Sequence, residues 1–204
     1  MPDDEARASL ADLRFVNRWL GNRRAFRAAV RPFLEASPHP RLLDVGCGSA
    51  DVPAAIVRGL GRPMLAVGLD AKRLHLQEAP REVAPIQGDV LRLPFKPRSF
   101  DVVTASLFLH HFGDDALPEL LRSLFALARR ALVVNDLHRA WVPYLFGRAV
   151  FRPLFRSRVS VEDGLLSIRR GFREEDLEQA FARAGIPVRI RRSWPYRLLA
   201  VAAH

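Results

Sequence analysis

A strand that runs directly into a glycine-rich turn constrains the fold of this chain more than any other feature. Residues 41–51, Arg-Leu-Leu-Asp-Val-Gly-Cys-Gly-Ser-Ala-Asp, begin with an apolar run that is typical of a buried strand. Gly46 and Gly48 permit a tight turn and a close approach of a ligand to the main chain. Asp51 is suited to the N-cap of a following helix, and Pro53 to its first turn. The N–H groups at such a helix start predict a nucleotide-like ligand.

Apolar strands and amphipathic helices alternate after this turn, which predicts a mainly parallel, doubly wound α/β sheet. Two helices are expected before it, over residues 4–35, where Asn17 and Arg18 are either surface residues or contacts for a ligand carboxylate. The strands are expected at residues 42–45, 64–70, 83–89, 100–106, 131–136, 188–190 and 198–202. The alternation pauses between residues 137 and 172, which marks an insertion.

Composition limits the kinds of site, the cellular location and the partners that the protein can have. Cys47 is the single cysteine, so an intrachain disulfide and a cysteine-based metal site are excluded. The acidic start does not look like a signal peptide, and no apolar run is long enough to span a membrane, which together predict a cytoplasmic protein. The net charge of +10 is nearly all arginine, and it indicates a basic surface, an anionic substrate or an acidic partner.

Three acids follow three consecutive predicted strands. Asp44 stands in the glycine turn, Asp70 ends the second strand and Asp89 follows the third. Because the carboxyl ends of such strands border one crevice, an acid about 20 residues beyond the turn is placed to bind the hydroxyls of a ribose. The third glycine of a dinucleotide-binding turn is absent, since Asp51 occupies that position. This favours a ligand without a pyrophosphate.

These motifs resemble those of the class I S-adenosylmethionine-dependent methyltransferases, over residues 40–136. Residues 43–50 are similar to motif I of the family, Leu93-Pro94-Phe95 and 99–103 to its "LPF…SFDVV" run, and 109–112 to the segment after strand four in ubiquinone/menaquinone-type methylases. The resemblance implies S-adenosylmethionine as cofactor, with Asp70 on the ribose and Gly88-Asp89-Val90 on the adenine. The cofactor-binding residues expected from it are Asp44, Gly46, Cys47, Gly48, Asp70, Ala71, Asp89, Val90 and Ser106.

The resemblance also implies the architecture. We expect a Rossmann-like, mostly parallel seven-stranded sheet with an antiparallel last strand, in a single methyltransferase domain spanning residues 1–204. Its expected parts are an N-terminal helical cap (1–38), a cofactor-binding core (39–136), a helical lid insertion after strand five that binds substrate (137–172), and a C-terminal helix and strand pair (173–204).

Missing motifs limit the choice of methyl acceptor. The fourth strand is not followed by the Asn/Asp-Pro-Pro-aromatic motif of amino-methylating DNA enzymes, and Ser106 stands where metal-dependent catechol methylases place an acid. We therefore expect metal-free O- or C-methylation of a lipophilic small molecule, such as a phenol, polyketide or quinol. A general base for that reaction is expected among His138, His111 and His110, with His138 favoured because it opens onto the insertion.

The insertion carries the remaining substrate information. Residues 141–156 are aromatic and aliphatic, with Arg148, Arg152 and Arg156 near one helical face. They form a lid packed on the core, an apolar tunnel for the acceptor, or a helix lying on an anionic membrane. Polar contacts to a phenolic head are expected from Ser160, Asp163 and Ser167. No nucleic-acid partner is expected, although an RNA methyltransferase and a non-catalytic cofactor-binding scaffold remain the alternatives.

Overall fold

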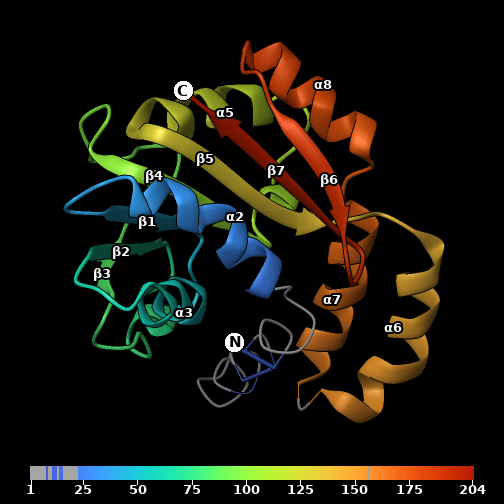
Figure 1. Cartoon of the computed structure of the whole chain (residues 1–204). Coiled ribbons are helices and arrows are strands. Elements are labelled where there is room, and N and C mark those ends of the chain that lie inside the picture. The colour runs from blue at the N-terminus through green and yellow to red at the C-terminus, as the bar shows by residue number, and fades with distance from the viewer. Residues whose placement is uncertain (1–7, 9–10, 13, 16–22, 156) are drawn as a thin grey trace.

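A seven-stranded sheet with helices on both faces forms the body of the protein (Figure 1). The computed structural model describes residues 8, 11–12, 14–15, 23–155 and 157–204, so Asn17, Arg18 and Arg156 lie outside the described residues. The strand order is β3-β2-β1-β4-β5-β7-β6. β7 pairs antiparallel with β5 and β6, and the other neighbours pair in parallel. The predicted doubly wound sheet with an antiparallel last strand is confirmed.

The elements follow the predicted alternation. The strands are β1 Arg41–Val45, β2 Leu65–Asp70, β3 Ala84–Gln87, β4 Phe100–Ser106, β5 Ala128–Leu137, β6 Arg189–Ser193 and β7 Arg197–Ala203. The helices are α2 Arg23–Glu35, α3 Asp51–Leu60, α4 Arg73–Leu76, α5 Leu117–Leu127, α6 Trp141–Leu154, α7 Arg158–Arg170 and α8 Glu174–Ala184, with a 3-10 turn, η1, at Leu109–His111.

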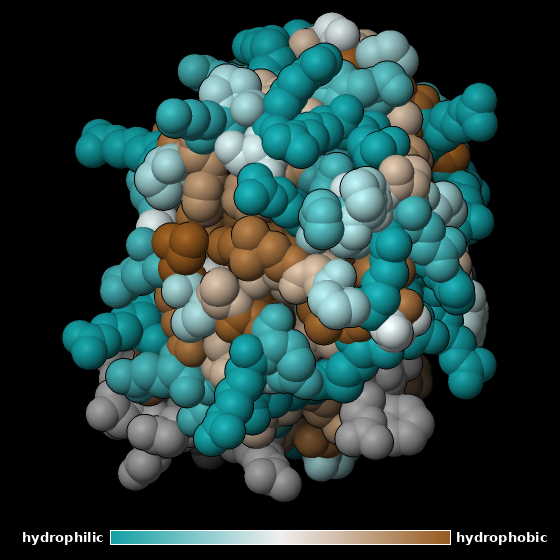
Figure 2. Space-filling model, turned by 60° about the vertical axis from the view of Figure 1, so that its left-hand side comes forward, coloured by the Kyte–Doolittle hydropathy of each residue, from teal (hydrophilic) through white to brown (hydrophobic). Residues whose placement is uncertain are grey.

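Successive residues of the central strands feed two hydrophobic layers. Leu42 of β1 packs with α2 and α3, whereas Leu43 packs with α5 and α8, because side chains alternate between the faces of a strand. Figure 2, turned toward the side of β2 and β3, shows hydrophilic residues around a central hydrophobic patch. The helices packed on both faces hold the central strands in place. The positions of the residues at the carboxyl ends of those strands are therefore well defined.

Two local predictions were wrong. Asp51 is the first helical residue of α3 rather than its N-cap, because Ala50 holds the N-cap position in the left-handed conformation, at φ 54°. The alternation of strands and helices predicts a helix over residues 71–79, after β2, but α4 has only four residues. The glycine turn therefore extends as far as Ala50 before the chain enters α3.

The insertion after β5 contains two packed helices, α6 and α7, which project beyond the sheet in Figure 1. Gly147 and Gly164 make room for Phe151 between them, since an added Cβ would lie 2.9 Å and 3.0 Å from its Cε2. α7 also contacts η1, so the insertion borders the carboxyl ends of the strands. Over the described part of the chain, helices are too short or too polar to cross a bilayer.

Candidate active site

Strand register aligns the predicted site residues along one edge of the sheet. Val45 at the end of β1 pairs with Leu69 of β2 and with Ala105 of β4. One residue further along, Asp70 pairs with Gln87, and Ser106 pairs with Asn135. The glycine turn, Asp70 and Ser106 therefore lie along one edge of the sheet, the edge at which ligands bind in open α/β sheets.

Asp70 is bound to the glycine turn through backbone donors. The Gly48 N–H donates to its Oδ2 at 2.9 Å, and the Lys72 N–H donates to its Oδ1 at 2.8 Å. Burial raises the pKa of Asp70, but the nearby His75 imidazole and these two N–H groups outweigh burial and lower it. The carboxylate is thus ionised, half-buried and able to accept further hydrogen bonds at the crevice.

Gly46 accommodates an aromatic side chain. Its φ of +63° lies in the left-handed region, and a Cβ at this position would lie 2.1 Å from Cδ2 of Phe108. Phe108 follows β4 in the loop that leads to η1, so the turn and this loop are in direct contact. The close approach that glycine permits here is made by Phe108.

Asp44 and Cys47 lie beneath the turn. Asp44 is 1% exposed, and its Oδ1 accepts a 2.6 Å hydrogen bond from Thr104 Oγ1. Burial raises the pKa of Asp44 to about 7, although the hydrogen bond from Thr104 acts in the opposite direction. Cys47 packs with Ala50, Ala54 and other apolar residues, and burial raises the pKa of its thiol. Their side chains support the turn from within the fold.

The remaining expected cofactor contacts lie around this edge. Asp89 is exposed and its Oδ1 accepts from the Leu91 N–H at 2.9 Å, while the Val90 side chain is buried in the core. Ala71 is exposed after β2. Ser106 Oγ accepts a 3.2 Å hydrogen bond from the side-chain amide of Asn135.

His110 and Asp136 form a buried pair at the ends of η1 and β5. His110 Nδ1 lies 2.7 Å from Asp136 Oδ1, and the two side chains are 3% and 0% exposed. Burial raises the pKa of Asp136, but His110 and the N–H groups of Leu137 and Leu109 outweigh it and lower the pKa. With the proton on Nδ1, His110 Nε2 carries a lone pair, and this buried atom has no hydrogen-bond partner among the residues that the structure describes.

The other two histidines have different surroundings. The His111 ring lies 4.2 Å from the His110 ring, and burial of part of the residue, together with the charge of His110, lowers its pKa to about 4. His138 lies on the β6 side, where its ring stacks on Tyr196 at 6.5 Å. Burial and Arg192 lower the pKa of His138. The structure therefore groups His110 with His111 and gives His138 separate neighbours.

Three site residues were missed by sequence reasoning. Asp136 was predicted only as the end of a strand, although a further acid at the end of a strand, here β5, was a usable signal. Arg14 donates to Ser49 Oγ in the turn at 3.1 Å and pairs with Glu78 at 2.9 Å. Arg197 is 5% exposed at the start of β7. Isolated arginines among the many in this chain gave no sequence signal.

A model of a methyltransferase domain family matches residues 42–131, the segment that contains the turn, the strand-end acids and η1. The matched segment is a methyltransferase domain, as the resemblance to the class I S-adenosylmethionine-dependent methyltransferases predicts. The methyltransferase domain is 32% identical to the 2-phytyl-1,4-naphtoquinone methyltransferase of Thermosynechococcus vestitus over 115 residues, which are 52% of this chain and 50% of the relative. The chain spans about half the length of the curated relatives it matches.

Solved structures share the fold across nearly the whole chain. The plantazolicin methyltransferase BpumL, in complex with a triazolic desmethylPZN analog and SAH, matches with a TM-score of 0.72 and 16% identity, covering 94% of this chain and 88% of that chain. Magnesium protoporphyrin IX methyltransferase from Synechocystis PCC 6803, with bound SAH, matches with a TM-score of 0.62 and 18% identity, covering 90% and 84%. These likenesses extend the shared fold to the insertion and the C-terminal strands.

Proposed function

We propose that this protein is a metal-independent methyltransferase that uses S-adenosylmethionine to methylate an oxygen or carbon of a lipophilic small molecule of the phenol or quinol type. The observation that carries this proposal is the ionised Asp70, held by the Gly48 N–H at the same strand edge as Asp89. This arrangement fits an adenosine, because one carboxylate faces ribose hydroxyls and another faces an exocyclic amine. The family match over residues 42–131 supports the same ligand.

The acceptor class rests on the relatives and on the crevice. The relative with 32% identity is named for a naphthoquinone, a lipophilic ring system of the predicted type. Phe108 and Phe112 lie together between the turn and α5, with ring centroids 5.2 Å apart, and supply an apolar wall for such a ring. These observations favour a small aromatic acceptor over the RNA alternative.

S-adenosylmethionine, when bound, supplies an activated methyl group on a sulfonium. The protein has to hold the acceptor in line with that methyl group and to remove a proton from a phenol or enol. His110 Nε2 is suited to accept this proton, since Asp136 orients the ring and stabilises the imidazolium that forms. The geometry therefore favours His110 over His138, which sequence position alone had favoured.

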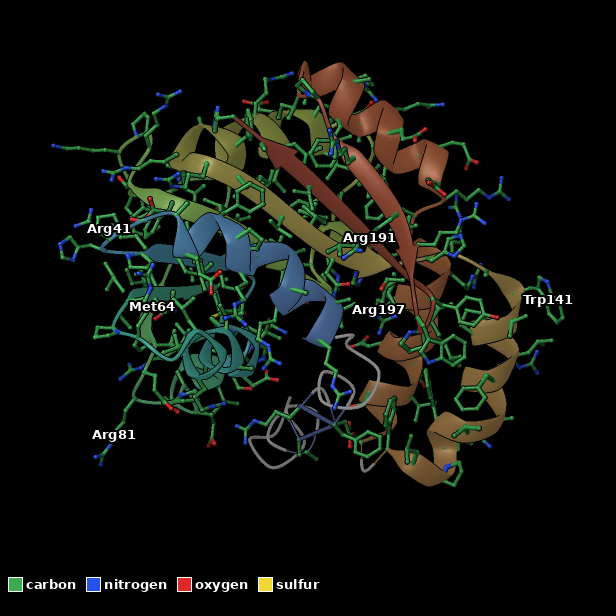
Figure 3. All side chains as sticks on the ribbon, in the orientation of Figure 1. Arg41, Met64, Arg81, Trp141, Arg191 and Arg197 are labelled. Carbon is green, nitrogen blue, oxygen red and sulfur yellow. The ribbon has the colours of Figure 1, made fainter. Side chains whose placement is uncertain are left out.

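A peripheral membrane contact through residues 141–156 is part of the proposal. Trp141, Leu145 and Phe146 on the outer side of α6 are 74%, 52% and 53% exposed, and Arg148 and Arg152 are exposed near them. Figure 3 shows Trp141 pointing away from the body of the protein. Apolar side chains beside arginines suit an anionic bilayer, in which a lipophilic acceptor dissolves. Co-sedimentation with phosphatidylglycerol vesicles should decrease for Leu145→Glu, and equal sedimentation would contradict this contact.

The test of function is methyl transfer from labelled S-adenosylmethionine to a panel of naphthohydroquinones and alkylated phenols, with total RNA as a parallel acceptor. We expect label in the organic extract, without added metal and in the presence of EDTA. Label in RNA alone would replace the proposed acceptor. SAH binding without transfer to either class of acceptor would support the non-catalytic scaffold.

A further inference from the structure

Arg197 is a buried arginine whose hydrogen-bonding capacity is almost unused. The residue is 5% exposed, and within the described part of the chain its Nε has no hydrogen-bond partner and its Nη1 donates only to the backbone oxygen of the adjacent Tyr196, at 3.3 Å. No described carboxylate forms an ion pair with it. A guanidinium carries five N–H donors, and a buried charge without a partner is costly. The guanidinium of Arg197 therefore has unused N–H donors that are suited to an anionic ligand.

The guanidinium remains charged in this position. Burial lowers the pKa of Arg197 to about 10, while the charge of Asp136 acts in the opposite direction. Arg197 is consequently protonated at neutral pH, and the field of Asp136 links it to the His110 pair without a direct salt bridge.

Register places Arg197 on the acceptor side of the crevice. It pairs with Leu137, the residue after Asp136, at the carboxyl end of β5. The strand order separates β7 from β1 by β4 and β5, so at about 4.8 Å per step Arg197 lies roughly 14 Å from the glycine turn strand. Figure 3 shows Arg197 near the junction of β5, β6 and β7. It is too far from the turn to serve the adenosine.

We propose that Arg197 is the anion-recognition residue of the acceptor subsite, where its guanidinium pairs with an anionic oxygen carried by an aromatic acceptor. The anion is a phenolate, an enolate or a ring carboxylate other than the hydroxyl that His110 deprotonates, and all three form charge-assisted hydrogen bonds to arginine. At the strand end that also carries Asp136, such pairing fixes the ring and selects acidic acceptors over neutral ones of equal size. This inference rests on the proposed function, because it names the acceptor class of the same site.

Two matched pairs of probes test the preference. 2-Hydroxy-1,4-naphthoquinone, an enolate at neutral pH, is compared with 1,4-naphthoquinone, and 1-naphthoate with 1-naphthamide, by titration calorimetry with and without saturating SAH. We expect the anionic member of at least one pair to bind about 10-fold tighter or more. The pair that shows the preference identifies the enolate or the carboxylate. Equal affinity within both pairs would overturn the proposal.

Variants assign the preference to Arg197. Arg197→Gln should abolish the difference within each pair while the Kd for SAH is unchanged, and Arg197→Lys should retain part of it. Arg191→Gln, on the exposed surface of β6, is the matched control and should retain all of it. A preference that survives Arg197→Gln would contradict the role.

Thermal unfolding separates recognition from structure. Removing an uncompensated buried charge should leave the Tm of Arg197→Gln unchanged or raised. A lower Tm together with an unchanged preference would assign Arg197 to folding and overturn the proposal. If Arg197→Gln does not fold, the probe pairs on the wild-type protein and on Arg197→Lys decide. If the protein does not bind SAH but still prefers the anionic probes, the proposed function is refuted and the role of Arg197 in anion recognition stands.

Discussion

The two ends of the crevice differ in how their buried polar groups are satisfied. At the cofactor end, Asp70 accepts from two backbone N–H groups and Asp44 accepts from Thr104. At the proposed acceptor end, His110 Nε2 and Arg197 Nε are buried without hydrogen-bond partners among the described residues. A site for an invariant ligand can be assembled in advance from the chain itself. The acceptor end retains free donors and acceptors, which indicates that the substrate completes it.

Two buried acids, Asp44 beneath the turn and Asp136 beside His110, differ in the direction in which their pKa is shifted. Asp44, bound to a hydroxyl, has its pKa raised by burial to about 7. For Asp136, the opposing contributions of His110 and backbone N–H groups outweigh burial and lower the pKa. Charge is therefore maintained beside the reaction site and suppressed beneath the turn.

The largest expected effect is on turnover. His110→Gln should reduce kcat by about 10²–10⁴-fold, because the proton acceptor is lost. The Kd for SAH should be unchanged, since His110 lies at the acceptor end. His138→Gln is the matched control and should alter kcat by less than about 3-fold. A greater loss for His138→Gln than for His110→Gln, in the same methyl-transfer assay, would restore His138 as the base.

Urea unfolding at pH 5 and pH 8 should distinguish the two acids. Asp136→Asn should cost about 1–3 kcal/mol at pH 8, because it weakens the buried hydrogen bonds that the carboxylate accepts from His110 Nδ1–H and the Leu109 N–H. The lowered pKa of Asp136 makes its contribution present above about pH 4 and lost as the pH falls through the folded-state pKa.

Asp44 should show the opposite pH dependence. Its raised pKa favours the folded state below about pH 4, and this contribution is lost as the pH rises through about 7. Asp44→Asn should therefore be more stable than wild type at pH 8, while the difference disappears or reverses at pH 5. Parallel pH profiles for the two variants would contradict this difference between the acids.

A smaller effect is expected from two hydroxyls. Thr104→Val should cost about 1–3 kcal/mol, since Asp44 loses its donor within the fold. Ser160→Ala should change the free energy of unfolding by less than about 0.5 kcal/mol, because its Oγ has no partner to lose. Equal losses of unfolding free energy in the two variants would contradict the difference between the bonded hydroxyl of Thr104 and the unbonded hydroxyl of Ser160.

The cofactor end could be predicted from the sequence because its geometry is local. β1, the glycine turn and α3 are consecutive in the sequence. Asp70 and Asp89 follow the neighbouring parallel strands β2 and β3, so they lie at the same edge of the sheet as the turn. The confirmed sheet rests on the same periodicity. Local signals failed at Ala50, where a left-handed residue displaced Asp51 from the N-cap.

The acceptor end depends on packing between distant segments. The contact between His110 and Asp136 joins residues 26 positions apart, and it requires η1 to fold back onto the end of β5. The burial of Arg197 follows from the antiparallel pairing of β7. The sequence offered His110 as a candidate base through the segment after β4, but its pairing with Asp136 and the burial of Arg197 appear only in the three-dimensional arrangement.

Titration calorimetry with SAH tests the central claim, that the glycine turn and Asp70 hold the adenosine of the methyl donor. The wild-type protein should bind one SAH per chain, and Asp70→Ala should weaken binding by about 10–100-fold, as expected for the loss of charge-assisted hydrogen bonds. Asp115→Ala, an exposed acid before α5, should bind as wild type does. Absence of binding to the wild-type protein, or equal affinity in Asp70→Ala, would contradict the account.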